Sequence, residues 1–374
     1  MRRTIVIVCV FLVAASSFAV EYRGPDGISF DLPEGWTAFG EARNEAFSFT
    51  NANREAFLQV FRFGRDDSVP ITRVFERVKA GLKAEGDAVP YTLFGKEGVF
   101  SGVSFSAAGA PVSGYAVCVR TETADVAAIA YAFTSSDYED QLLSALDSIA
   151  FEDEDLRRPG LVSQFMLAPG EDDLTARIGF SGFSTTFSLQ SKEFEVAQLV
   201  VDREARLLAK SDGSDLDTWK RFYRMIYRDN YGRYAEAGIA FSEYAAPLEP
   251  RAVAEELLGW VQTWKYERTG TLADLLNPYE AGMREVGDCD ARGLVYAILL
   301  HYADIDASLL VSTKYSHAVG AVSVGGSGAT VSTHKGPQIV AETTEKVELG
   351  LIAADQADPA GWTVVDLDGR RGPR

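Results

Sequence analysis

One segment in the C-terminal half constrains the fold most strongly, because a short polar turn leads directly into a helix that is apolar on nearly every side. The turn is Gly287-Asp288-Cys289-Asp290, and the apolar helix runs on to Leu300. A helix without a polar face has to lie at the centre of a domain. Cys289 then stands at its N-terminus, where backbone N–H groups and the helix dipole stabilise a thiolate. The segment therefore predicts a nucleophilic cysteine on a rigid scaffold.

A cysteine nucleophile needs a partner that takes its proton and returns one to the leaving group, and imidazole suits that task. His317 begins an apolar strand expected over 317–324, and Glu342 lies in a further strand expected over 339–344. Antiparallel pairing of these strands would bring Glu342 beside His317, where a carboxylate orients the ring and stabilises its charged form. We therefore expect Cys289, His317 and Glu342 to form a catalytic triad.

These residues resemble the transglutaminase-like superfamily, whose papain-like fold places a Gly-x-Cys helix against a sheet that bears the histidine and the acid. The resemblance covers about residues 252–351 and rests on Gly287-Asp288-Cys289-Asp290, on His317-Ala318 and on Glu342-Thr343-Thr344. It implies an α+β domain with Cys289 as the nucleophile, His317 as base and acid, and Glu342 as the orienting acid. Two positions depart from the family pattern: Val319 replaces a common aromatic residue, and the acid is a glutamate without a preceding tryptophan.

Residues 20–151 show a different pattern, in which short alternating runs are interrupted by two segments with helical spacing. The strands are expected at 27–32, 56–63, 98–106, 113–121 and 127–133, and the helices at 71–84 and 136–149. Helices and an antiparallel sheet in one unit predict an α+β module. Its element order and its opening phrase, Ile28 to Trp36, resemble the PsbP/Mog1-like fold. That resemblance implies a binding or assembly module and transfers no catalytic residue.

The region between these two parts divides into a linker and a helical stretch. Charge and Pro/Gly residues concentrate at 152–160, which predicts an interdomain linker. Residues 161–250 carry an expected strand pair at 174–189 and helices at 194–210 and 216–228. They lead into the core domain at 251–374, whose first helix is expected over 251–268. The helix at 216–228 carries an aromatic stripe that core packing explains: Trp219, Phe222, Tyr223, Ile226 and Tyr227.

The first nineteen residues have the pattern of a secretory signal peptide: Arg2 and Arg3, an apolar run over 5–15, and Ser17-Phe18-Ala19 before the expected cut. We therefore expect export to the periplasm or the extracellular space. No later apolar run reaches the roughly 20 residues of a spanning helix, so no integral membrane segment is expected. The net charge of −18 disfavours nucleic acid and anionic membranes as partners.

Cysteine usage argues against a disulfide scaffold, since the expected mature chain keeps only Cys118 and Cys289. A single bridge between them is conceivable, but Cys118 lies in an apolar run and is expected to be a small buried core residue. A metal site of Cys289, His301 and His317 is formally available, yet no close ligand pair such as Cys-x-x-Cys supports it. We expect neither a metal nor a cofactor.

Two functions stay open at this point. The first is an exported cysteine enzyme that acts on amide bonds through a thioester. Hydrolysis would make it a peptidase or amidase, and attack by an amine would make it an acyltransferase. Its expected substrate is a peptide, protein or cell-wall amide, with a protein partner at the N-terminal module. The second is a catalytically inactive binding or assembly protein of the cell envelope, which the departures at Val319 and Glu342 motivate.

Overall fold

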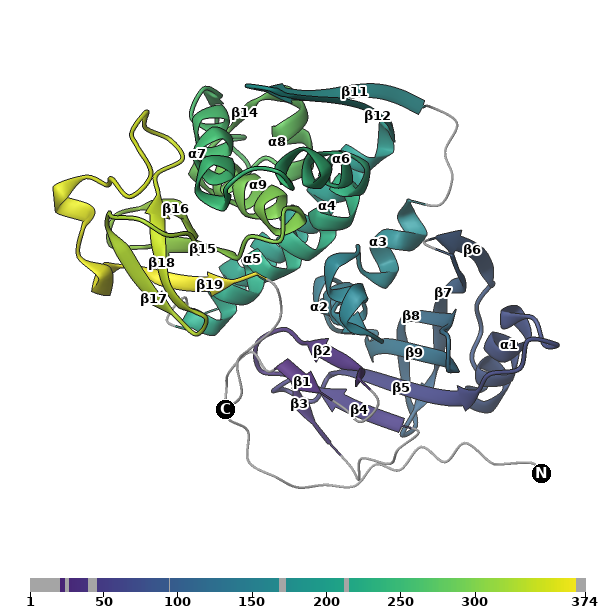
Figure 1. Ribbon diagram of the computed structural model, residues 1–374. Coiled ribbons are helices and arrows are strands. Elements are labelled where there is room, and N and C mark those ends of the chain that lie inside the picture. Colours follow the sequence, from purple (N-terminus) through teal and green to yellow (C-terminus); the bar gives the residue numbers. More distant parts are fainter. Residues whose placement is uncertain are drawn as a thin grey trace. The chain divides into compact units, whose positions relative to one another are not determined.

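The computed structural model describes residues 21–23, 27–39, 46–93, 95–167, 173–211 and 215–367, so the expected signal peptide at 1–19 lies outside the described residues. The chain is of the α+β class, as predicted (Figure 1). It divides into two compact units. Unit 1 comprises residues 1–155, 160–169 and 209–221, and unit 2 comprises residues 156–159, 170–208 and 222–374. None of the helices in the described ranges has the length and apolar character needed to cross a bilayer.

Unit 1 is built on a seven-stranded antiparallel sheet of strand order β3-β4-β5-β9-β8-β7-β6. Its strands are β3 (Thr37–Ala38), β4 (Ala46–Thr50), β5 (Ala56–Gly64), β6 (Val89–Leu93), β7 (Lys96–Ala107), β8 (Ala110–Arg120) and β9 (Ala124–Phe133). The long strands β7, β8 and β9 follow one another through tight turns, and hairpins of this kind set the register of their neighbours. The sequence pattern placed β5, β7, β8 and β9 within a few residues of their observed bounds and did not predict β3, β4 and β6.

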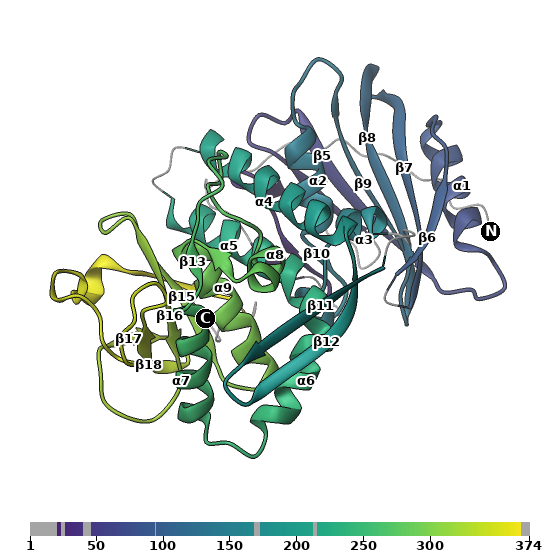
Figure 2. The same cartoon turned by 90° about the horizontal axis from the view of Figure 1, so that it is seen from above.

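Helices cover both faces of this sheet (Figure 2). Helix α1 (Ile71–Leu82) packs on one face through Val74 and Val78, and α2 (Glu139–Asp147) packs on the other through Leu142 and Leu146. Strand β9 therefore buries side chains on both sides and has no polar alternation. A small sheet of β1 (Glu21–Arg23), β2 (Ser29–Asp31) and β10 (Ile149–Ala150), together with α3 (Leu161–Met166), belongs to the same unit.

The acidic run expected in the linker at 152–160 is ordered rather than solvated. Asp153–Arg157 forms a short 3-10 helix. Lys96 of β7 lies 2.8 Å from a carboxylate oxygen of Glu152 and 2.6 Å from one of Asp155, which is buried. The other oxygen of Asp155 accepts the N–H of Phe151 at 3.0 Å. A lysine more than fifty residues upstream pairs with two of the four acids, and no local pattern could indicate that partner.

Unit 1 also takes in residues 209–221, which are distant in sequence from the rest of it. Arg221 donates to the carbonyl of Asp31 at 2.8 Å and to the hydroxyl of Ser144 at 2.6 Å. Thr218 donates to Glu34 at 3.1 Å. These contacts tie the segment to β2, to the turn that follows β2 and to α2.

In unit 2, helix α9 (Cys289–Tyr302) is buried along nearly its whole length, because every side chain from Cys289 to His301 except Asp290 is buried. This confirms its predicted central position. The remaining helices are α4 (Lys192–Lys210), α5 (Leu216–Tyr231), α6 (Ala235–Ala245), α7 (Pro250–Val261) and α8 (Pro278–Arg284). Helices α6, α7 and α8 pack against α9. A two-stranded hairpin, β11 (Asp173–Phe180) and β12 (Phe183–Gln190), matches the expected strand pair.

The other partner of α9 is a five-stranded antiparallel sheet of order β17-β18-β16-β15-β19. Its strands are β15 (Ala307–Ser312), β16 (His317–Val322), β17 (Thr330–Thr333), β18 (Gly336–Ala341) and β19 (Thr363–Asp366). Close approach of helix and sheet needs a glycine in β16, because a Cβ on Gly320 would lie 2.8 Å from the ring of Tyr296.

The helix expected over 251–268 ends earlier, at Val261. The side chain of Gln262, at the C-cap, donates to two carbonyls outside the helix. The chain then continues into β13 (Lys265–Tyr266), which pairs in parallel with β14 (Val286–Gly287). The helical spacing of Trp264 reflects burial, not a continued helix. This early end brings Tyr266 beside the turn that carries Cys289.

Candidate active site

The nucleophile turn is held by a helix cap. Asp288 is the N-cap of α9, and its Oδ1 accepts the N–H of Ala291 at 2.9 Å. Such caps contribute about 1 kcal/mol. The turn also needs a small residue before the cap, because a Cβ on Gly287 would lie 3.0 Å from that of Ala291. Cys289 follows as the first helical residue, and its backbone N–H has no acceptor within the helix.

The histidine and the acid meet through strand pairing. Strands β16 and β18 are antiparallel neighbours, as predicted, and Gly320 lies opposite Ala341. The strand expected over 339–344 ends at Ala341, so Glu342 lies just beyond it. His317 begins β16, Glu342 directly follows β18, and His317 Nε2 lies 2.8 Å from Glu342 Oε2. An ionised carboxylate only accepts hydrogen bonds, so Nε2 is the donor in this contact.

Glu342 is held in its charged form. Its Oε1 accepts both the N–H of Thr344, at 2.8 Å, and the hydroxyl of Thr344, at 2.6 Å. Burial by itself raises the pKa of this carboxyl. The bonds from His317 and Thr344 outweigh burial and hold the pKa below its usual range. Glu342 is therefore a carboxylate at neutral pH, as an orienting acid requires.

The sulfur of Cys289 lies against the start of the strand that carries His317. The N–H of Ala318, the residue after His317, donates a hydrogen bond to the Cys289 sulfur. The backbone next to His317 thus contacts Cys289, and the ring of His317 contacts Glu342. Cys289 and Glu342 are nearly fully buried, while the His317 side chain keeps 16% of its surface exposed and is accessible to a ligand.

Two carboxylates flank the sulfur. The thiol of Cys289 donates to Asp290 Oδ2 at 3.4 Å, and the hydroxyl of Tyr223, from α5, donates to Asp290 Oδ1 at 2.6 Å. Burial, followed by the charges of Asp290 and Asp288, raises the pKa of the Cys289 thiol far above its ordinary value. The N–H of Ala318 opposes this only in part. The resting cysteine is therefore a thiol and not the thiolate that the sequence predicted.

Cys289 is a thiol because the effects that oppose a thiolate outweigh the helix dipole. A helix N-terminus offers about half an elementary charge, whereas lost hydration and two nearby carboxyls act together against a thiolate. Burial and the charge of Asp290 also raise the pKa of Asp288. The sequence indicated the helix terminus, but the prediction of a thiolate left out the two acidic residues beside Cys289, Asp288 and Asp290.

Arg292 connects the separate parts of the site. It is fully buried, and its guanidinium donates to the carbonyls of Gly287 at 3.1 Å, Trp264 at 2.7 Å and Thr343 at 3.3 Å. The carbonyl of Gly287 belongs to the turn before α9, that of Trp264 to the segment after α7, and that of Thr343 to the segment after β18. A single arginine within an apolar helix was the sequence signal for this role, and it was missed.

The other histidines have partners away from the triad. The ring of His301 lies 2.6 Å from the hydroxyl of Tyr227 and 3.0 Å from the carbonyl of Ala307, and His334 lies 3.1 Å from Asp366. Across the described ranges, no group of three or more His, Cys, Asp or Glu side chains is placed to hold a metal ion. Cys118 and Cys289 are both free thiols.

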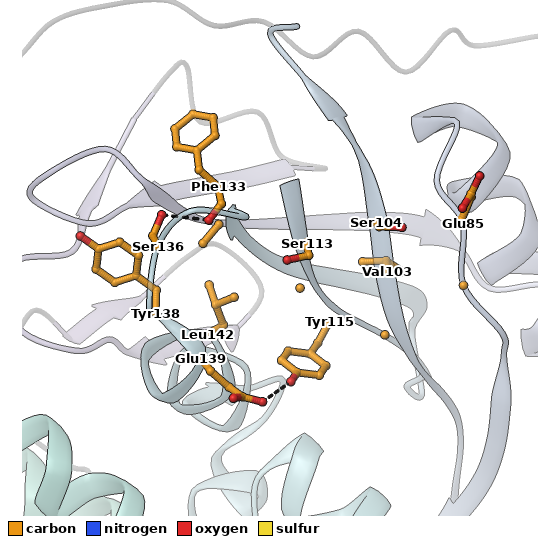
Figure 3. A pocket seen from close by; sticks show the side chains of 14 residues that line it. Glu85, Val103, Ser104, Ser113, Tyr115, Phe133, Ser136, Tyr138, Glu139 and Leu142 are labelled. Carbon is orange, nitrogen blue, oxygen red and sulfur yellow. Dashed lines mark hydrogen bonds between the residues drawn. The ribbon is translucent and has the colours of Figure 1, made fainter. Parts of the chain in front are cut away.

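A pocket of about 540 Å³ lies in unit 1, apart from these residues (Figure 3). Its floor is an uncovered part of the sheet with small side chains, among them Gly102, Ser104 and Ser113. Tyr115 stands on its rim and donates to Glu139 at 2.5 Å. The residues that line the pocket offer hydroxyl and carboxyl groups but include no cysteine or histidine.

Comparison with known proteins identifies no family for this chain. No family model matches it, and no curated protein does. Among solved structures, one from Bacteroides thetaiotaomicron aligns at 10% identity over 56% of this chain and 76% of its own, with a TM-score of 0.27. A protein of unknown function from Pseudomonas aeruginosa aligns at 11% identity over 32% of this chain and 85% of its own, with a TM-score of 0.21.

Proposed function

We propose that this chain is a transglutaminase-like cysteine enzyme that acts on amide bonds through a thioester. One observation carries the proposal: His317 is bonded to the ionised Glu342, while the next residue along the strand, Ala318, bonds the sulfur of Cys289. Acyl transfer requires a nucleophile, a base and an orienting acid, and Cys289, His317 and Glu342 are the residue types that supply them. The roles assigned to Cys289, His317 and Glu342 are part of the proposal.

In the first half-reaction the sulfur attacks the amide carbonyl carbon, and the thiol proton passes to His317 Nδ1 as the S–C bond forms. The backbone N–H of Cys289 is a donor for the oxygen that becomes negative. The C–N bond then breaks, and His317 gives the proton to the departing amine. Glu342 holds the ring and stabilises its charged form throughout.

In the second half-reaction water or an amine attacks the thioester carbon, and His317 takes a proton from the attacking group. The C–S bond breaks and the sulfur regains a proton. Water yields a carboxylic acid and makes the chain a peptidase or amidase, whereas an amine yields a new amide. The substrate class that fits an exported chain is a peptide, protein or cell-wall amide.

The N-terminal module fits the role of a binding region for that substrate or for a protein partner. Support comes from its pocket, whose lining combines small side chains with the hydroxyls of Ser104, Ser113 and Tyr138. Export through the N-terminal segment belongs to the same proposal and rests on the pattern of residues 1–19 alone.

The direct test is acylation by p-nitrophenyl acetate, followed by turnover on a peptide library with products read by mass spectrometry. We expect acetyl on Cys289, none in Cys289→Ala, and turnover about 10²–10⁴-fold lower in His317→Ala. Cys118→Ala and His334→Ala are the matched controls and should behave as wild type. Acylation that persists in Cys289→Ala, or that ignores His317→Ala, contradicts the proposal.

One observation favours the alternative, a catalytically inactive assembly protein. Cys289 is nearly fully buried and its pKa is raised by burial and two acids, the opposite of a preformed thiolate. An inactive protein would show no acetyl-enzyme in the same experiment.

A further inference from the structure

Asp290 stands out among the residues around Cys289, because it contacts the nucleophile directly and the proposed reaction assigns it no step. It immediately follows Cys289 in α9 and is the only residue between Cys289 and His301 that is not fully buried. Its Oδ2 lies 3.4 Å from the Cys289 sulfur. Its Oδ1 accepts the hydroxyl of Tyr223 at 2.6 Å.

The Tyr223 contact fixes the carboxylate in this position. Tyr223 is buried, and its hydroxyl comes from a different helix, so the bond joins α5 to the first turn of α9. Burial, followed by the charge of Asp290, raises the pKa of Tyr223, which therefore stays protonated and remains a donor. One oxygen of Asp290 is thus engaged by the phenol, and the other faces the thiol.

The sulfur is consequently placed between a donor and an acceptor. The N–H of Ala318 donates to the sulfur, while the S–H donates to Asp290. A carboxylate that accepts the S–H bond favours the neutral thiol, because ionisation would place two negative charges side by side.

We infer that Asp290, anchored by Tyr223, is a positioning residue that keeps Cys289 as a neutral thiol in the resting enzyme. The inference rests on the proposed function and describes how that site is regulated. The thiol gives up its proton only when the S–C bond forms and His317 accepts it. An exported protein gains from this arrangement, since a neutral thiol reacts slowly with oxidants and stray electrophiles.

The pH response of Cys289 depends on every charged or titratable group around it. These are Asp288 and Asp290 on its own segment, His317 on β16, Tyr223 on α5, Arg292 one turn along α9, and Tyr266 and Arg268 after α7. Asp290 is the carboxylate bonded to the sulfur itself, so its removal should have the largest effect.

The test is the rate of Cys289 carbamidomethylation by iodoacetamide as a function of pH, with peptide mass spectrometry separating Cys289 from Cys118. For wild type we expect a midpoint above the roughly 8.5 of an ordinary thiol. Asp290→Asn should lower the midpoint by at least about one pH unit, which is about tenfold faster labelling at pH 7. Asp290→Glu keeps a carboxylate and should keep the midpoint high.

The matched control is Asp304→Asn, which makes the same change of charge just beyond the far end of α9. Asp304 lies about 20 Å from Asp290 at 1.5 Å per helical residue, so the midpoint should not move. Equal lowering in Asp290→Asn and Asp290→Glu would indicate a loosened site and overturn the inference. So would an unchanged midpoint in Asp290→Asn.

A wild-type midpoint at or below about 8.5 overturns the inference by itself, even if Asp290→Asn fails to fold. This outcome differs from failure of the proposed function. An enzyme whose turnover depends on Cys289 but whose thiol ionises near 8.5 refutes only the role of Asp290. A high midpoint that depends on Asp290, found without any acetyl-enzyme, refutes only the proposal that this protein is an enzyme.

Discussion

Glu342 accepts a hydrogen bond from Nε2 of His317 at 2.8 Å, and this contact determines which nitrogen of the imidazole can take a proton. Because Thr344 occupies the other oxygen of Glu342 through both its N–H and its hydroxyl, the carboxylate cannot turn away from the ring. In the proposed reaction Glu342 acts through the orientation of His317, so its removal should affect turnover more than folding.

Glu342→Gln should lower turnover about 10²–10⁴-fold, because an amide can stabilise neither the required tautomer nor the charged ring. The measurement is the rate of the peptide or ester assay on purified variants. Glu345→Gln is the matched control, since Glu345 is exposed three residues away, and it should retain full activity. If Glu342→Gln turned over as fast as wild type, Glu342 would have no role in the mechanism.

The depressed pKa of Glu342 also predicts a pH dependence of stability. A carboxyl with a lowered folded-state pKa stabilises the native state above its ordinary value of 4.5, and this stabilisation is lost as the pH falls through the folded-state pKa. The difference in unfolding free energy between wild type and Glu342→Gln should be largest above pH 5 and should shrink at lower pH. Urea unfolding from pH 3 to 7 measures it. A difference that grows toward acid would contradict the assigned direction.

Arg292→Met should destabilise unit 2 by about 2–5 kcal/mol, because three buried carbonyls lose their donor at once. The Met side chain fills much of the volume, so packing changes little. Arg284→Met is the control, since Arg284 is half exposed and paired with Glu280, and such surface changes fall within about 0.5 kcal/mol. Urea unfolding followed by tryptophan fluorescence compares the two variants.

Gly320→Ala should destabilise unit 2 by about 1–3 kcal/mol, since its Cβ would press on the ring of Tyr296 at 2.8 Å. Gly102→Ala in β7 makes the same change where no atom lies within 4 Å of the new Cβ. It should be neutral within about 0.5 kcal/mol or slightly stabilising. Thermal unfolding of both variants provides the comparison, and equal losses would refute the helix–sheet contact.

The sequence predicted the features that depend on periodicity. The buried course of α9, the strands β5, β7, β8 and β9, and the antiparallel pairing beside Glu342 all follow from which faces must avoid water. The aromatic stripe of α5 was likewise expected to pack in the core, and Tyr223 and Tyr227 are buried.

Periodicity identifies a buried face but not the partner of each polar atom. The hydroxyl of Tyr223 meets Asp290 and that of Tyr227 meets His301, although the two tyrosines are equivalent in the sequence pattern. The bonds of Arg292 reach residues up to 51 positions away in the sequence. Such contacts depend on the assembled fold. The protonation state of Cys289 was predicted wrongly because the prediction from the helix terminus left out burial and the charges of Asp288 and Asp290.

Unit 1 consists of segments that are separated in the sequence by parts of unit 2, and this affects how it can form during synthesis. Because Arg221 and Thr218 bond to Asp31, Ser144 and Glu34, the first unit is incomplete until residue 221 has left the ribosome. By then part of the second unit has already been made. A chain that ends at residue 167 would lack these contacts, so truncation at that point would remove part of unit 1 itself as well as unit 2.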